Sequence, residues 1–303
     1  MRLLAVTLTL LLGCHGDAIP PREFDGPRAM QYVKAQLDFG PRIPGTPGHD
    51  RMAAWLDSLL RVTADSVVAQ RWTHRNAKGD SLHLVNFIAR FNVAATTRLL
   101  FLAHWDTRPR ADGPLSRDST LPVPGANDGA SGVAVLLGMA DALKKDAPTI
   151  GVDLLFVDGE DYGDFNTDTD VLLGSRYYAS HLLPGPAPRY AVLFDMIGDK
   201  DLRIPQEGLS LTAAPDVVEL VWSLAARMGH ADVFVPEDQG ALTDDHVPLQ
   251  QVGIRAIDLI DFTFGGPQNQ WHHSPDDTID KVSVASLQVV GDVGLALIRT
   301  AKP

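Results

Sequence analysis

The sequence has a single cysteine, Cys14, among its 303 residues. An intrachain disulfide is therefore excluded. Long apolar runs are also missing. The run from Leu3 to Leu12 is too short to span a bilayer, and no other segment is long and apolar enough to do so.

Positive charge is scarce as well. Lysine and arginine together number 26 against 38 aspartates and glutamates, which gives a formal net charge of −12. Because the sequence contains no basic patch, nucleic acid is not expected as a partner. An acidic field of this kind tolerates cationic small molecules or the amino termini of peptides better.

The first residues resemble a bacterial lipoprotein signal. Arg2 precedes the apolar run, which ends in Leu11-Leu12-Gly13-Cys14. We therefore expect residues 1–14 to be a signal peptide and the protein to be exported, with a lipid on Cys14 as its only membrane attachment. That places it in the periplasm or on the surface of a bacterial cell. The alternative is a plain secretory peptide cleaved nearby.

Residues 15–27 are polar and contain proline, which is typical of a tether, and residues 28–303 are expected to form one catalytic domain. From residue 98 onward, strands and helices alternate. This predicts an α/β fold of three layers, α/β/α, with a mixed, mostly parallel central sheet and helices on both faces. Two earlier strands, 65–73 and 82–91, add an antiparallel edge. The expected helices cover 28–39, 49–61, 129–145, 174–182, 214–228, a short segment capped by Thr243, and 283–300.

Histidines and carboxylates stand where the predicted strands end. Strand 98–103 leads to His104 and Asp106, and strand 190–194 leads to Asp195. Asp128 lies in the loop before helix 129–145, and His273 lies in the loop before the last helix. In such sheets, ligands bind beyond the carboxyl ends of the strands. Imidazole with carboxylate suits zinc, and Asp128 is well placed to bridge two such ions.

Strand 152–157 runs into the acids Asp158, Glu160 and Asp161. Adjacent carboxylates repel each other, and a divalent metal would offset the repulsion, with one acid as ligand and its neighbour free for proton transfer. Taken alone, the stretch also fits a solvated acidic loop. The motifs in the other segments favour the metal site.

The order of the motifs resembles the family-28 zinc aminopeptidases and the glutaminyl cyclases that share their fold. The motifs are His-x-Asp at 104–106, Asn-Asp-Gly-Ala-Ser-Gly at 127–132, Asp-Gly-Glu-Asp at 158–161, Phe-Asp-Met-Ile-Gly at 194–198, Asp-Asp-His at 244–246 and His-Ser-Pro-Asp-Asp-Thr at 273–278. The likeness runs from about Phe39 to the C-terminus. It implies one or two zinc ions held by His104, Asp128, Asp161, Asp195 and His273.

The resemblance also implies individual roles. Asp128 matches the bridging ligand, Glu160 the general base and acid, and Asp106 the acid that orients His104. His273, rather than His272, matches the ligand because the family pattern places a serine or threonine directly after it. Asp161 stands in place of a more usual glutamate, so its shorter arm must bring the backbone nearer the zinc.

Two chemistries remain open, and both act on peptide or protein N-termini. A glutaminyl-peptide cyclotransferase closes an N-terminal glutamine to pyroglutamate and releases ammonia, whereas an aminopeptidase hydrolyses the first peptide bond. Asp244 matches the acid that holds the substrate amide in cyclases, and Tyr162–Leu173 resembles their specificity loop. A helix N-terminal acid is the plainer interpretation of Asp244. We take the cyclotransferase as the main prediction.

Other positions favour the aminopeptidase. Asp258 stands where animal cyclases have a histidine near the active site. Asn166 stands where they have a tryptophan, with Phe165 the nearest aromatic. Gly129–Gly132 is similar to the aminopeptidase version of that helix start. We expect Trp271, Phe165 and Asp258 to lie at or just behind the substrate. A monomer is expected, and a non-catalytic lipoprotein that binds peptide or metal is the third alternative, disfavoured because Glu160 and every ligand position are present.

Overall fold

Six strands form the central sheet of the computed structural model, which describes residues 22–303. The predicted signal peptide, Cys14 and most of the predicted tether lie outside the described residues. The strand order is β1-β2-β4-β3-β5-β8. The strands are β1 (Ser66–Arg75), β2 (Ser81–Phe91), β3 (Arg98–His104), β4 (Gly151–Val157), β5 (Ala191–Asp195) and β8 (Ala256–Ile260). Strands β4, β3, β5 and β8 run parallel, and β1 and β2 are antiparallel, as the alternation predicted.

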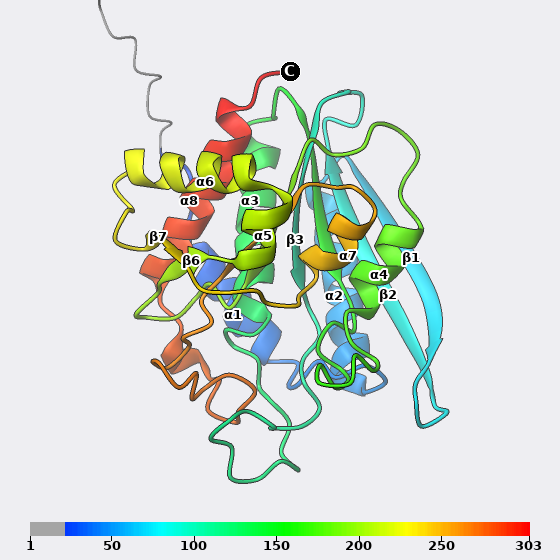
Figure 1. The fold of residues 1–303 in the computed structure, drawn as a ribbon. Helices are drawn as coiled ribbons and strands as arrows, with labels where there is room; N and C mark the ends of the chain where they lie inside the picture. The colour runs from blue at the N-terminus through cyan, green and yellow to red at the C-terminus, as the bar shows by residue number, and fades with distance from the viewer. Residues whose placement is uncertain (1–21) are drawn as a thin grey trace, which may run out of the picture.

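Successive side chains of the strands point to opposite faces of the sheet, and each face packs into its own hydrophobic core. Phe101 and Phe194 belong to the larger core. It is covered by α1 (Gly26–Leu37), α2 (Pro47–Thr63), α3 (Ala130–Lys145), α6 (Pro215–Arg227) and α8 (Val284–Thr300). Leu100 and Leu102 face the smaller core together with Leu249. There α4 (Leu173–Ser180) and α7 (His246–Gln251) cover the sheet, and Figure 1 shows them in front of it, with α1 and α2 behind. The three-layer prediction is therefore confirmed.

The helices begin where the sequence provides caps. The side chain of Thr46 accepts a hydrogen bond from the backbone of His49, and Pro47 occupies the first turn of α2. Ser283 caps α8 in the same way. The prediction that Thr243 caps a helix is wrong, because α7 starts at His246 and Thr243 stays in the preceding loop. That loop reaches the site described below.

Several short elements were not anticipated. They are β6 (Ile204–Gln206), α5 (Gly208–Ala213), β7 (Phe234–Asp238) and a 3-10 turn, Ile279–Lys281. Strands β6 and β7 pair with each other outside the main sheet. Elements of three to six residues carry too few side chains for a periodic pattern to stand out.

The folded domain starts earlier than the predicted boundary at residue 28. Phe24 is buried, and Gly26 is the first residue of α1. The Phe24 ring lies against α8 so closely that a Cβ on Gly291 would come within 2.3 Å of it. Within residues 22–303, none of the helices combines the length and the apolar character needed to cross a membrane.

Candidate metal centre and adjoining cavity

Parallel strands bring the predicted site residues to one edge of the sheet. His104 is the last residue of β3, and Asp195 is the last residue of β5. The acids Asp158–Asp161 follow β4, while Asp128 and His273 arrive on loops that precede α3 and α8. The five predicted ligands therefore meet although they lie up to 169 residues apart in the sequence.

A first group gathers around the imidazole of His104. Its Nε2 lies 3.0 Å from Oδ1 of Asp128 and 3.3 Å from Oδ1 of Asp195. All three side chains are buried. One nitrogen and two carboxylate oxygens at these separations can converge on a single cation.

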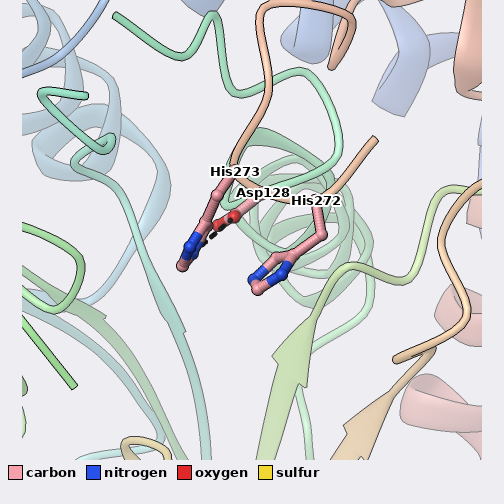
Figure 2. A group of neighbouring side chains, drawn as sticks. All are labelled: Asp128, His272 and His273. Atoms are coloured by element: carbon pink, nitrogen blue, oxygen red, sulfur yellow. Dashed lines mark ion pairs between the residues drawn. The ribbon is translucent and has the colours of Figure 1, made fainter. Parts of the chain in front are cut away.

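A second group gathers around His273. Its Nε2 lies 3.2 Å from Oδ1 of Asp161 and 3.7 Å from Oδ2 of Asp128. Figure 2 shows the pairing of His273 with Asp128. Since one oxygen of Asp128 faces His104 and the other faces His273, its carboxylate stands between the two groups, which is the geometry of a bridging ligand.

His272 joins this second group, which the sequence reasoning did not anticipate. A ring nitrogen of His272, one of His273 and an oxygen of Asp128 lie within 4.8 Å of one another. Burial lowers the pKa of His272 to about 3, and His273 adds to this, so the imidazole is neutral. Its ring packs edge-on against Phe262, with ring centroids 5.2 Å apart. The doubled histidine in the sequence was the available signal.

The donors present fit a borderline-hard cation such as zinc. Oδ2 of Asp161 and Nδ1 of His104 are buried without a hydrogen-bond partner in residues 22–303. Three carboxylates, from Asp128, Asp161 and Asp195, crowd into one buried volume. A divalent cation would relieve their repulsion and engage the free Asp161 oxygen.

Glu160 stands beside both groups but is not part of either. Its Oε2 lies 3.7 Å from Nδ1 of His104. Burial raises the pKa of Glu160 well above its usual range; His104 opposes this, and the nearby acids Asp161 and Asp244 add to it. A buried carboxyl with a raised pKa beside the metal ligands suits general acid and base catalysis.

Asp106 contacts the acidic loop in addition to His104, which the resemblance implied that it orients. Its Oδ1 lies 3.7 Å from Nδ1 of His104. The same carboxylate accepts hydrogen bonds from the backbone N–H groups of Glu160 and Asp161, at 3.1 and 3.2 Å. Asp106 therefore fixes the acidic loop as well as lying next to the imidazole.

A cavity of about 270 Å³ opens beside the two groups. Its polar lining includes Glu160, Asp195 and Asp244, so Asp244, a predicted substrate-binding residue, faces the same space as two predicted site residues. The apolar lining comes from Phe165, Met196, Leu242, Ile260 and Phe262, and the two histidines 272 and 273 complete the wall. Phe165, which was expected at or just behind the substrate, is thus part of the cavity wall. Burial raises the pKa of Asp244 to about 7, and the neighbouring Asp195 adds to this.

Trp271 and Asp258, which were expected at or just behind the substrate, do not line this cavity. Trp271 packs edge-on against Phe264, with ring centroids 5.5 Å apart, and the next residue, His272, lines the cavity. Asp258 is fully buried on β8, with Oδ2 3.9 Å from Nδ1 of His246. It lies behind the cavity wall.

Glu207 is a further polar residue that the sequence did not reveal. Its carboxylate accepts hydrogen bonds from the backbone of Leu209, Ser210 and Leu242, at 2.7, 2.6 and 2.8 Å. It also lies 3.2 Å from Nε2 of His246. Glu207 therefore ties the loop that carries Asp244 to the start of α5.

Comparison with known proteins places these features in a family. The model for peptidase family M28 matches residues 86–298. Aminopeptidase YwaD of Bacillus subtilis is 30% identical over 194 residues. That match covers 61% of this chain but only 39% of the relative, so the chain spans about two fifths of that protein's length.

Solved structures agree over nearly the whole fold. The glutaminyl cyclase of Bacteroides thetaiotaomicron, bound to N-acetylhistamine, superposes with a TM-score of 0.87 and is 33% identical, with 94% of this chain and 100% of that chain covered. A Zn-dependent exopeptidase from Parabacteroides distasonis also has a TM-score of 0.87, at 32% identity and with the same coverage. Both kinds of enzyme therefore share this fold.

Proposed function

The chain belongs to peptidase family M28, and from that premise we propose that it is a zinc-dependent glutaminyl-peptide cyclotransferase, which converts an N-terminal glutamine to pyroglutamate and releases ammonia. The observation that carries the choice is the position of Asp244. It lines the same cavity of about 270 Å³ as Glu160 and Asp195, so a carboxyl group faces the space beside the metal ligands.

The residues that would hold zinc are His104, Asp128, Asp161, Asp195 and His273. Whether one ion or two are held, Asp128 would be a ligand, since its oxygens face both imidazoles. Bound zinc would polarise the side-chain amide carbonyl of the glutamine. The protein residues supply proton transfer and orientation.

Glu160 is the residue that moves protons in this scheme. It takes a proton from the α-amino group of the substrate, whose nitrogen forms a bond to the side-chain amide carbon. The bond from that carbon to the amide nitrogen then breaks, and Glu160 returns the proton to the departing ammonia. Water is not consumed. The raised pKa of Glu160 suits both halves of this transfer.

Asp244 would orient the glutamine. Its carboxylate can accept a hydrogen bond from the amide NH2 group, which directs the carbonyl oxygen toward the metal ligands. The apolar side chains of Phe165, Ile260 and Phe262 line the cavity, where they would contact the methylene groups of the glutamine and shield the reacting atoms from water. An orienting acid and an apolar enclosure together favour cyclisation over hydrolysis.

A zinc aminopeptidase is the second candidate, and one observation favours it. Two sets of three ligand atoms converge, with Asp128 in both, and a pair of metal ions held in this way would suit the activation of water. Glu160 would then take a proton from the attacking water. The likeness to the Zn-dependent exopeptidase fits this alternative.

The deciding experiment compares two substrates on the zinc-loaded enzyme, Gln-β-naphthylamide and Leu-p-nitroanilide. Release of ammonia, with a product that retains the naphthylamide, supports the cyclotransferase. Release of nitroaniline without ammonia supports the aminopeptidase and overturns the main proposal. Glu160→Gln serves as the inactive control in both assays.

We also propose that the enzyme acts as an exported monomer anchored through Cys14. Large exposed apolar side chains in residues 22–303 include Val62 on α2, Leu220 on α6 and Leu182 in the loop after α4. Scattered exposed apolar side chains are ordinary on the surface of a monomer. A sedimentation experiment that gives twice the chain mass would contradict the monomer.

A further inference from the structure

Arg108 is a buried arginine in the long loop between β3 and α3, and it joins two carboxylates. Its Nη1 donates to Oδ1 of Asp161 at 2.6 Å and to the backbone oxygen of the same residue at 3.3 Å. Its Nε and Nη2 donate to the two oxygens of Asp112, at 2.5 and 2.7 Å. The guanidinium thus binds Asp112 in a bidentate manner on one side and a candidate metal ligand on the other.

Asp112 continues the connection to a second candidate ligand. Its Oδ1 lies 3.4 Å from Nδ1 of His273. A carboxylate at this nitrogen favours the tautomer with the proton on Nδ1, which leaves Nε2 free on the side of Asp161 and Asp128.

The backbone of His273 is held by the same loop. Its carbonyl oxygen accepts hydrogen bonds from the backbone of Gly113 at 3.0 Å and from the hydroxyl of Ser116 at 3.1 Å. The residue has a φ of +50°, in the left-handed region that side chains with a Cβ rarely occupy. A Cβ on Gly113 would come within 2.0 Å of the carbonyl oxygen of His272, so this close approach requires glycine.

We propose that Arg108 and Asp112 are positioning residues for the second metal group, which together hold Asp161 and His273 and thereby set the affinity of that group for zinc. This inference rests on the proposed zinc enzyme and adds the residues that pre-organise one half of its site. The first group is different, because in the part of the chain that the structure describes neither Arg108 nor Asp112 forms an ion pair with His104 or Asp195.

Charge gives a reason for an arginine at this position. Asp161 shares the centre with Asp128, Asp195 and Glu160, all of them buried. Without a nearby cation, the repulsion among these acids would displace the Asp161 side chain from the position that faces His273. Arg108 compensates part of that charge and still leaves Oδ2 of Asp161 without a hydrogen bond.

The arginine also connects the metal group to the cavity. Its guanidinium lies 5.9 Å from the centre of the Phe165 ring, which lines the cavity wall. A change at Arg108 should therefore disturb substrate contacts as well as metal binding, whereas a change at Asp112 should act mainly through His273 and Arg108.

If Arg108 and Asp112 formed an ion pair that only stabilises the loop, their replacement would leave the affinity for zinc unchanged in the folded protein. The variants are Arg108→Ala, Arg108→Lys and Asp112→Asn, with Arg110→Ala as the matched control, since Arg110 is exposed on the same loop. Lysine keeps the charge but cannot donate to both carboxylates in a fork, so it should restore binding only in part.

Metal-free protein of each form is titrated with zinc against a chromophoric chelator, and the absorption spectrum of the cobalt-substituted form is recorded. Arg108→Ala and Asp112→Asn are expected to weaken zinc binding about 10- to 100-fold and to alter the cobalt spectrum. The zinc affinity of Arg108→Lys should lie between those of the parent protein and Arg108→Ala, and that of Arg110→Ala should equal that of the parent protein.

Unchanged zinc affinity and an unchanged cobalt spectrum in folded Arg108→Ala or Asp112→Asn overturn the inference. If Arg108→Ala does not fold, Asp112→Asn and Arg108→Lys decide it by the same measurements. Failure of the parent protein to bind zinc would instead refute the proposed zinc enzyme, so the two failures are distinguishable. None of these readouts requires turnover of a substrate.

Discussion

One carboxylate oxygen of Asp106 accepts a hydrogen bond from the backbone N–H of Glu160 at 3.1 Å. The other oxygen accepts the next N–H, that of Asp161, at 3.2 Å. A short strand-end motif, His-x-Asp, therefore controls the shape of a loop more than fifty residues away. Because the backbone fixes the position of Glu160, its side chain can be changed without moving the metal ligands.

Glu160→Gln is expected to remove turnover while zinc stays bound. Glutamine has nearly the same shape but cannot accept and return the proton, and general acid and base catalysis contributes about 10²- to 10⁴-fold. The rate constant and the zinc content of the purified variant are measured together, with the exposed Glu219→Gln as control. A variant that keeps near-normal turnover would remove Glu160 from the mechanism.

Asp244→Asn tests the recognition of glutamine. The amide cannot accept hydrogen bonds with a charged oxygen, and hydrogen bonds to charged groups contribute about 1.5–3 kcal/mol. We expect kcat/KM for Gln-β-naphthylamide to fall about 10- to 100-fold, with unchanged zinc content. Asp232→Asn, at an exposed position, is the control. Equal efficiency in the Asp244 variant would place recognition elsewhere in the cavity wall.

Removal of the metal should destabilise the fold as well as abolish activity. A cation that binds the native state and not the unfolded chain raises the melting temperature, and the rise grows with the logarithm of the free metal concentration relative to Kd. Here the cation would also offset the repulsion among Asp128, Asp161 and Asp195. Dialysis against a chelator is expected to lower Tm, and added zinc should restore both Tm and turnover. Full activity after exhaustive chelation would contradict a metal enzyme.

Glu207 predicts how stability depends on pH. Burial would raise its pKa, but His246 and the N–H donors of Leu242 and Leu209 outweigh burial and lower the pKa to about 2, from 4.5. An acid whose pKa is lower in the folded state stabilises the protein above its unfolded pKa. This contribution, on the order of 3 kcal/mol, is lost as the pH falls from about 4.5 toward 2.

Urea unfolding measured across this acid range should therefore show a shallower loss of stability in Glu207→Gln than in the parent protein. Glu219→Gln should follow the parent curve, since Glu219 is exposed on α6. If the free energy of unfolding fell equally with pH in the parent protein and in Glu207→Gln, the lowered pKa of Glu207 would be refuted.

The proposed lipid anchor is tested at Cys14. Cys14→Ser removes the thiol that would carry the lipid, so the protein should move from the membrane fraction to the soluble fraction after cell lysis. Metabolic labelling with a radioactive fatty acid should mark the parent chain and not the variant. A Cys14→Ser protein that remains in the membrane fraction would rule out anchoring at this residue.

The edge of the sheet that holds the site was predictable from the sequence alone. Apolar strands ending in His104 and Asp195, together with alternating helices, indicate a parallel sheet, and parallel strands place their carboxyl ends at one edge. The expected roles of Asp128 as a bridging ligand and of Asp244 in holding the substrate came from motifs whose order resembles the family, and these motifs lie close to helix starts. These inferences rest on short contiguous motifs, which can be recognised in the sequence without knowledge of the packing.

Only the tertiary structure decided which other side chains support that site. Asp112 and His273 are 161 residues apart, and Glu207 reaches Leu242 across 35 residues. No local periodicity encodes such pairs, because they depend on how two irregular loops pack together. The same reason explains why His272 rather than Trp271 faces the cavity. The strands and motifs determined where the chemistry lies, and the packing of the loops decided which groups position it.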